Sequence, residues 1–209
     1  HLLSRRQRQM CIRDRSNFDI SDNTFARVAY ENKAWAFVSD YARLKIVFDY
    51  GGIYLDTDVE LLKSLDHLLD NKCYIGIQQA QSLCQTGLGF GAEKNSYIVE
   101  KMLEKYSNIE FDVNKKLELA CPILNSEAIS SIGTWNIDNV NYWDEITIYP
   151  SKYFDPYGGK NLLCKDTISI HHYSASWTSG RQRFKRRLAR LIGTGNVTNI
   201  KSKLKNLSN

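Results

Sequence analysis

Two aspartates, Asp56 and Asp58, stand two positions apart directly after the short apolar run of residues 53–55. We predict a buried strand over this run, because branched and aromatic residues follow a pair of glycines there. Alternate residues of an extended segment point the same way, so both carboxylates can face one cation. Carboxylate oxygens suit Mg²⁺ or Mn²⁺, which proteins hold with one or two carboxylates together with substrate phosphates. The pair therefore predicts a Mg²⁺ or Mn²⁺ site for a diphosphate, the alternative being a solvated turn or helix cap.

Asp40 and Arg43 form a second polar pair, on a helix that we predict over residues 33–50. Being three residues apart, they lie about one turn from each other and can act together on one polar ligand. Gly51 can take the left-handed conformation that ends a helix, and Gly52 lets the chain turn directly into the strand. The apolar side chains that recur every three or four residues, and that we expect to pack on a core, are Phe37, Tyr41, Leu44 and Phe48.

The whole run, Ser-Asp-x-x-Arg followed by Gly-Gly-x-Tyr-x-Asp-x-Asp, resembles in order and spacing the glycosyltransferases that contain a DXD sugar-binding region. These are the family 32 enzymes, related to the yeast-type initiating mannosyltransferases and to the clostridial toxin glucosyltransferases. The resemblance spans roughly residues 17–178 and is strongest over residues 35–60. It implies an α/β, GT-A type, Rossmann-like nucleotide-diphospho-sugar transferase domain, and a metal-dependent transfer that retains the anomeric configuration.

The resemblance gives roles to the two aspartates and to a histidine. Asp56 and Asp58 would hold the cation, and one of the adjacent His171 and His172 would complete the shell of the metal or of the leaving phosphate. Strand alternation allows only one of the two histidines to face the site, and we prefer His172. The alternative is that both histidines are ordinary surface or core residues.

The resemblance also implies a set of side chains around the donor. Asp40 would accept hydrogen bonds from sugar hydroxyls, while Arg43 would pair with Asp40 and reach the sugar or phosphate. Tyr54 would line the donor pocket, and no side chain is nominated as a covalent nucleophile. The predicted catalytic residues are Asp40, Arg43, Asp56 and Asp58. The remaining predicted donor contacts are Thr86 and Gly87, in a glycine-rich run, and Ser176 and Trp177, which would lie over the diphosphate.

The net charge of +5 is unevenly distributed along the 209 residues. Residues 1–15 carry +4 and residues 181–209 carry +9, so residues 16–180 carry a net charge of −8. A nucleic-acid enzyme concentrates basic residues in its binding cleft, so the acidic body argues against a nucleic-acid partner. Basic and apolar residues alternate at helical spacing over residues 181–192. This pattern predicts either an amphipathic helix on an anionic membrane surface or a solvated basic tail.

Charge and resemblance together divide the chain into three parts. Residues 1–15 fit neither a buried strand nor an amphipathic helix, and the string Met-Cys-Ile-Arg-Asp-Arg is typical of a translated sequencing adapter. We therefore predict either a foreign segment fused to a truncated gene or a native basic arm. Residues 16–180 form the predicted GT-A catalytic domain, without the N-terminal strand of that fold, and residues 181–209 form the basic amphipathic tail. The five cysteines, without Cys-x-x-Cys spacing, indicate reduced thiols rather than a zinc site or disulfides.

Local patterns predict the remaining secondary structure. The further predicted helices run from a cap at Ser21 or Asp22 to about Tyr30, from a cap at Ser96 to Tyr106, and onward from Ser126, with a short helix or turn at residues 61–69. The further predicted strands cover residues 74–78, 146–149 and 168–171.

These features together predict a bacterial glycosyltransferase that moves a sugar from a UDP- or GDP-linked donor to a saccharide or lipid-linked acceptor, in the synthesis of capsule or other surface polysaccharide. No apolar run reaches the ~18 residues of a membrane-spanning helix. We therefore expect a cytoplasmic enzyme that is peripheral at the inner face of the plasma membrane through residues 181–192. The alternative is a truncated, non-catalytic module that binds a sugar nucleotide or a metal.

Overall fold

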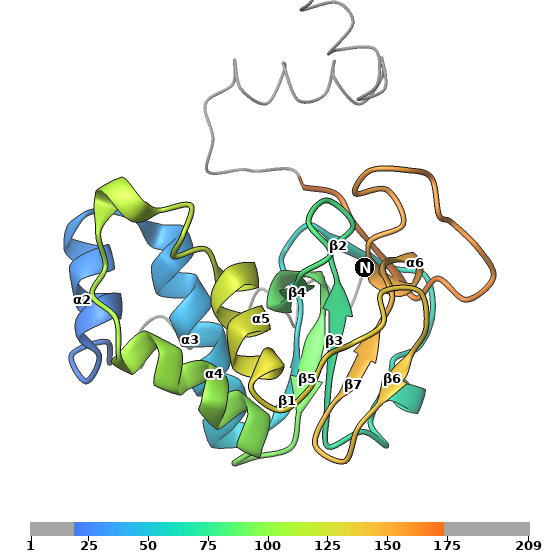
Figure 1. The fold of residues 1–209 in the computed structure, drawn as a ribbon, viewed down its shortest axis with the longest axis horizontal. Helices are drawn as coiled ribbons and strands as arrows, with labels where there is room; N and C mark the ends of the chain where they lie inside the picture. The colour runs from blue at the N-terminus through green and yellow to red at the C-terminus, as the bar shows by residue number, and fades with distance from the viewer. Residues whose placement is uncertain (1–18, 174–209) are drawn as a thin grey trace, which may run out of the picture.

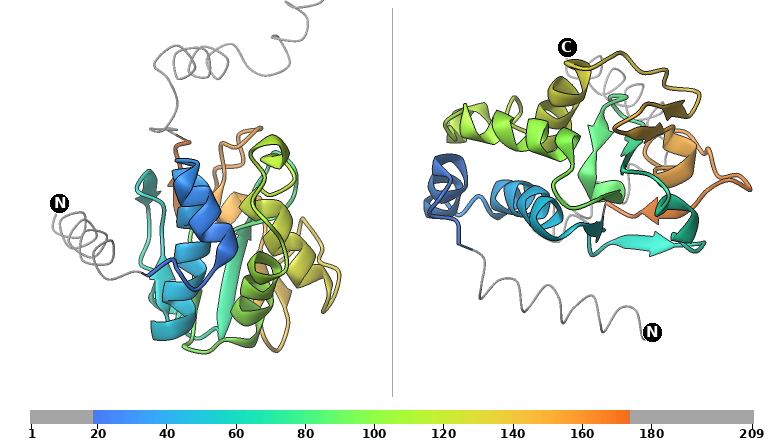
Figure 2. Two further views of the ribbon diagram at one scale, coloured as in Figure 1. Left: turned by 90° about the vertical axis from the view of Figure 1, so that its left-hand side faces the viewer. Right: turned by 90° about the horizontal axis from the view of Figure 1, so that it is seen from below.

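The computed structural model of the chain describes residues 19–173, in which a mixed β-sheet carries a layer of helices on one face (Figure 1). The view from below in Figure 2 shows the helices on one side of the sheet and several short elements on the other. The combination of a mixed sheet with packed helices confirms the predicted α/β class. The helices of the layer are α2 (Thr24–Glu31), α3 (Trp35–Tyr50), α4 (Tyr97–Ser107) and α5 (Cys121–Ser130).

The main sheet has the strand order β1-β5-β3-β7-β6, and β4 pairs with β3 outside this path. Strands β3 and β7 are parallel, with α4 and α5 in the connection between them, and the other pairs are antiparallel. The strands are β1 (Gly52–Tyr54), β3 (Cys73–Ile77), β4 (Cys84–Gln85), β5 (Phe90–Ala92), β6 (Asn141–Tyr142) and β7 (Thr147–Tyr149).

A second, two-stranded antiparallel sheet joins β2 (Val59–Leu61) to β8 (Ser169–His171). Its register places Val59 opposite His171, so the end of the described chain returns to the segment that follows β1. This pairing is what carries a distant part of the sequence to the two aspartates. The remaining short elements are the 3-10 helices η1 (Asp66–Leu68), η2 (Thr86–Leu88) and η3 (Val113–Lys115), and the helix α6 (Ser151–Phe154).

Strand β3 is buried on both faces and separates two apolar clusters. Its residues Cys73, Ile75 and Ile77 belong to the cluster beneath the helices, whereas Tyr74 belongs to a second cluster with Phe154. The alternation follows from the two-residue period of a strand. Strand β3 is therefore packed against apolar side chains on both faces of the sheet.

Helix α3 confirms the expectation for residues 33–50 with a later start. Lys33 has a φ of 55°, which a right-handed helix does not allow, so the helix begins at Trp35. Gly51 ends it with a φ of 69°, and Gly52 follows with a φ of 115°. These two conformations favour glycine and turn the chain directly into β1. Of the predicted apolar stripe, Tyr41 and Leu44 are buried, and Phe37 and Phe48 pack partly buried against the same core.

Several predicted boundaries were wrong. Asn23, rather than Ser21 or Asp22, caps α2, because its side chain accepts a hydrogen bond from the amide of Ala26 at 2.9 Å. Helix α5 begins at Cys121 rather than Ser126, since Pro122 is well tolerated in a first turn. Residues 59–61 form β2, so a strand replaces the start of the expected helix or turn at 61–69. Strand β6 and helix α6 were not predicted.

Three predictions concern residues outside the described part of the chain. They are the character of residues 1–15, the amphipathic helix over residues 181–192, and the placement of Ser176 and Trp177 over a diphosphate. Among the helices of residues 19–173, none is long and apolar enough to cross a membrane.

Candidate functional site

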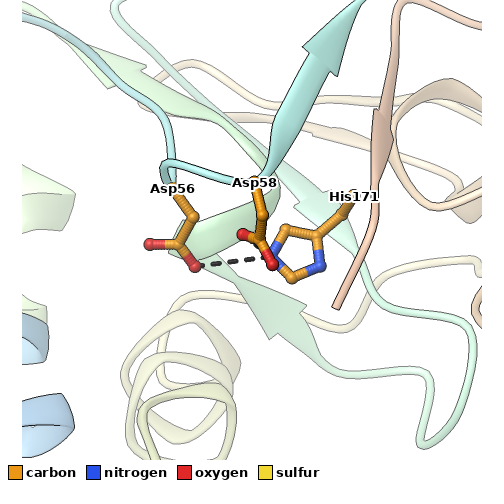
Figure 3. A group of neighbouring side chains, drawn as sticks. All are labelled: Asp56, Asp58 and His171. Atoms are coloured by element: carbon orange, nitrogen blue, oxygen red, sulfur yellow. Dashed lines mark hydrogen bonds and ion pairs between the residues drawn. The ribbon is translucent and has the colours of Figure 1, made fainter. Parts of the chain in front are cut away.

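Asp56, Asp58 and His171 converge on one point (Figure 3). Each offers one ligand atom, and these atoms all lie within 4.8 Å of one another. His171 Nε2 lies 3.4 Å from Asp56 Oδ2 and 3.3 Å from Asp58 Oδ1. The cluster joins the segment between β1 and β2 to strand β8, because the pairing of Val59 with His171 brings the two together. Two carboxylates and an imidazole are thus gathered from segments that lie 115 residues apart in the sequence, measured from Asp56 to His171.

The aspartates meet through a turn rather than through the alternation of an extended strand. Strand β1 ends at Tyr54, and the amide of Val59 donates to the carbonyl of Asp56 at 3.1 Å, which reverses the chain between them. The two carboxylates converge as expected, but the geometric reason was wrong, and their role as metal ligands stays a prediction. The turn is what allows β2 to leave the main sheet and pair with β8.

The histidine at the aspartates is His171 and not the preferred His172. Successive strand residues point to opposite faces, and the β2–β8 register turns His171 inward. His172 is exposed instead, with Nε2 2.8 Å from Glu60 Oε2 at the surface, and its amide donates to the carbonyl of Asp58 at 3.0 Å. We therefore replace His172 by His171 as the candidate ligand.

Arg43 links the turn at residues 56–59, called here the aspartate turn, to helix α3. Its guanidinium lies 3.0 Å from Asp40 Oδ1 and 3.3 Å from Asp56 Oδ1, and its Nε donates to the carbonyl of Ser39 at 3.2 Å. The guanidinium also lies over the Tyr54 ring, 4.6 Å from its centroid. Arg43 is nearly fully buried, so it holds two carboxylates in one orientation. The predicted Asp40–Arg43 pair is present, and its extension to Asp56 was not foreseen.

Tyr54 and Cys121 complete the hydrogen bonds of this network. The Tyr54 hydroxyl donates to Asp56 Oδ1 at 2.9 Å, and the Cys121 side chain is hydrogen-bonded to Asp40. Burial raises the pKa of the Cys121 thiol well above its usual value, so the thiol stays protonated and acts as a donor. Cys121 is not among the predicted site residues. Cys121 lies in the first turn of α5, and the packing of α5 beside η2 brings it to the site.

The charges of the network shift the pKa values of its members in different directions. Burial favours the neutral form of Asp56, but Arg43, His171 and Tyr54 outweigh it and hold the pKa of Asp56 below its usual value. Burial dominates for Asp40 and raises its pKa, against the opposing effect of Arg43. Burial alone would lower the pKa of His171, yet the two aspartates raise it to about 9. His171 must lose this proton before it can ligate a metal.

The donor set fits a divalent cation. With His171 neutral, the carboxylates of Asp40, Asp56 and Asp58 and the guanidinium of Arg43 leave a net charge of −2. Carboxylate oxygens suit Mg²⁺ and Mn²⁺, and an imidazole nitrogen is a softer ligand that Mg²⁺ uses less readily. The three ligand atoms would leave other coordination positions for phosphate oxygens or water.

Gly87 lies directly against the aspartate turn, whereas Thr86 is withdrawn from it. The amide of Asp56 donates to the carbonyl of Gly87 at 3.2 Å. Thr86 is fully buried, and its hydroxyl faces Cys121 Sγ at 3.9 Å. The roles of both residues as donor contacts remain predictions, and the contact of Gly87 with Asp56 gives that glycine a definite structural function.

We expect Gly87→Ala to reduce activity strongly, because the new methyl group would overlap Asp56 Oδ2 and stand 3.1 Å from Asp56 Cγ and 3.2 Å from Arg43 Nη1. A misplacement of about 1 Å in a catalytic group costs on the order of 100-fold in rate. Steady-state rates of donor hydrolysis, measured with and without metal, test this expectation. Gly133→Ala is the control, since the three atoms nearest to its methyl group all belong to the indole of Trp143. Equal rates for Gly87→Ala and the wild type would contradict the assignment of Asp56 to the site.

Comparison with known families covers the part of this site that holds the two aspartates. Residues 6–75 match the model of the family described as "Glycosyltransferase sugar-binding region containing DXD motif". The matched region contains α2, α3, β1 and β2 with Asp40, Arg43, Asp56 and Asp58, and it ends within β3. Its first matched residues fall within the segment 1–15. No curated protein matches the chain.

The match and the site agree on a class of protein. A sugar-binding region with a DXD motif supports a transferase that takes a nucleotide-sugar donor and an acceptor. The Asp56–Asp58–His171 cluster is a group that can hold the divalent metal such transferases generally bind. His171 lies outside the matched residues, so the structure, and not the family comparison, brings it to the motif.

Proposed function

We propose that this protein is a metal-dependent glycosyltransferase of the GT-A type, which transfers a sugar from a UDP- or GDP-linked donor with retention of the anomeric configuration. The observation that supports it most is the convergence of three side chains within 4.8 Å: the two DXD aspartates, which lie inside the region that matches the DXD family, and His171, which lies outside it. A divalent cation held by these three side chains would neutralise the negative charge that develops on the leaving phosphate.

The chain's own residues would orient the donor. Asp40 and Arg43 face the aspartate turn from α3, where the carboxylate can accept hydrogen bonds from sugar hydroxyls and the guanidinium can donate to a phosphate. Arg43 is fixed by Asp40, Asp56 and the Ser39 carbonyl before any donor binds. Such preorganised groups cost little reorganisation when charge moves in the reaction. Tyr54 holds Asp56 from the β1 side of the site.

The proposal extends to the rest of the chain. Residues 16–180 would form the catalytic domain, Ser176 and Trp177 would cover the diphosphate, and residues 181–192 would rest on an anionic membrane surface. The acceptor would be a saccharide or a lipid-linked sugar in the synthesis of bacterial surface polysaccharide. A membrane position would bring the enzyme to lipid-linked acceptors, and the +9 charge of residues 181–209 suits anionic lipid.

Donor hydrolysis by the purified 209-residue chain tests the proposal. A panel of UDP- and GDP-sugars is incubated with Mn²⁺, with Mg²⁺ and with chelator, and the released nucleotide is measured. We expect release from one donor that depends on metal, and NMR of the transfer product should show the anomeric configuration of the donor. An inverted product would contradict retention. Metal binding without turnover of any donor would instead favour the non-catalytic binding module.

A further inference from the structure

The imidazole of His171 faces the two aspartates through Nε2, and its other nitrogen has no partner among residues 19–173. A histidine that ligates a metal usually donates from its second ring nitrogen to a carboxylate or a carbonyl, which fixes the orientation of the ring. His171 is 6% exposed, so water reaches this side of it poorly. Within the described chain, the aspartates hold the ring at Nε2, and the side that carries Nδ1 must be held by packing.

Tyr173 supplies that packing. Its ring stands edge to face against the imidazole of His171, with 4.1 Å between the ring centroids and 77° between the planes. The two side chains are two residues apart, and Tyr173 reaches this position with a φ of 47°. A tyrosine in the left-handed region is strained, so other contacts must hold it there.

The buried carboxylate of Asp155 holds Tyr173. The Tyr173 hydroxyl donates to Asp155 Oδ2 at 2.8 Å, and the amide of Gln79 donates to the same oxygen at 2.7 Å. The Gln79 side chain donates to the carbonyls of Asp155 and Lys160, at 3.3 and 3.0 Å, and accepts from the Lys160 amide. Asp155 itself is fully buried. Its carboxylate is thus anchored to the end of β3 on one side and to Tyr173 on the other.

We propose that Asp155 is a positioning residue for the metal site: its bond to the Tyr173 hydroxyl holds the Tyr173 ring against His171, and this ring keeps Nε2 of His171 aimed at Asp56 and Asp58. The inference rests on the proposed function, because it gives a metal-ligating role to His171. It links the loop after α6 (residues 155–160) to the DXD aspartates. The sequence offers no spacing signal for it, since Gln79, Asp155 and Tyr173 belong to three separate segments.

Mn²⁺ binding by the full chain tests the connection, using Tyr173→Phe, which removes the hydroxyl and keeps the ring. We expect its dissociation constant for Mn²⁺ to rise about tenfold, the lower end of the effect seen when the partner of a metal ligand is lost. Asp155→Ala should show a similar loss, and the double variant should show little more, because the two residues act as a unit. Tyr157→Phe changes an exposed tyrosine near Asp155 and should leave the constant unchanged.

Asp155→Asn separates the hydrogen bond from the charge. The Gln79 amide and the Tyr173 hydroxyl both donate to Oδ2 of Asp155, so an amide carbonyl in that position can accept from both. We expect this variant to bind Mn²⁺ nearly as well as the wild type. A loss equal to that of Asp155→Ala would overturn the hydrogen-bond argument.

A second measurement needs no metal. Nitrogen chemical shifts of the imidazole of His171, read by two-bond proton–nitrogen NMR, should change in Tyr173→Phe, while those of the exposed His67 should not. If the wild type binds no Mn²⁺ but the His171 signals respond, the proposed function fails and the positioning contact stands. If Mn²⁺ binds through Asp58 while Tyr173→Phe alters neither affinity nor shifts, the positioning role is wrong and the proposed function survives.

Discussion

Replacing Arg43 by methionine is expected to lower the free energy of unfolding by about 3–5 kcal/mol, the range found when one partner of a buried ion pair is removed. Arg43 is nearly buried, and it faces Asp40 at 3.0 Å and Asp56 at 3.3 Å. Without it, the side chain of Asp40, only 12% exposed, must either keep a charge that burial opposes or take up a proton, and both cost stability. Chemical denaturation of the wild type and the variant measures the difference.

Two further variants separate charge loss from packing loss. Asp40→Asn together with Arg43→Met removes both charges of the pair, and we expect it to recover part of the stability lost in Arg43→Met alone. Arg27→Met is the matched control, because Arg27 also pairs with an acid along its own helix but at the surface, 3.5 Å from Glu31. Surface changes of this kind usually stay within about 0.5 kcal/mol. An equal effect of the two single arginine variants would show that the Arg43 network does not stabilise the fold.

Replacing Asp58 by asparagine is expected to raise the dissociation constant for Mn²⁺ by more than the roughly 10–100-fold that loss of an outer partner costs, because a ligand itself loses its charge. Asp58 Oδ1 lies 3.3 Å from His171 Nε2 within the candidate site, so the change acts where the cation would sit. Metal-dependent donor hydrolysis should fall with it. Titration of Mn²⁺ followed by electron paramagnetic resonance, alongside hydrolysis rates, measures both quantities.

Asp66→Asn is the control for this substitution. Asp66 is an exposed carboxylate in η1, a few residues along the same chain, and it is not part of the candidate cluster. It should leave both metal affinity and hydrolysis near the wild-type values. If Asp58→Asn hydrolyses the donor at the wild-type rate and still depends on metal, the DXD aspartates have no part in the proposed mechanism.

Much of the site could be predicted because its members are close in sequence. Asp40 and Arg43 are three residues apart on a helix, and that spacing alone places them side by side. The glycine pair predicted the break between α3 and β1, and the structure has positive φ angles at both glycines. Asp56 and Asp58 are near neighbours, so they could meet in a strand or in a turn. The sequence therefore predicted that Asp56 and Asp58 would lie close together, but not the turn that brings them there.

The rest depends on contacts between distant segments. Arg43 reaches Asp56 only because the glycines fold β1 back beside α3, and Asp155 reaches Tyr173 only through the packing around α6 and β8. No local pattern reports such distances, because each is the result of how whole elements pack.

The adjacent histidines show the division most clearly. The sequence by itself determined that only one of His171 and His172 can face the aspartates, because neighbouring strand residues point to opposite faces. Which of them does so was decided by the register of β8 on β2, in which His171 stands opposite Val59. A shift of one residue would exchange the two side chains, and register is set by burial and pairing across the fold. The tertiary structure therefore selects His171.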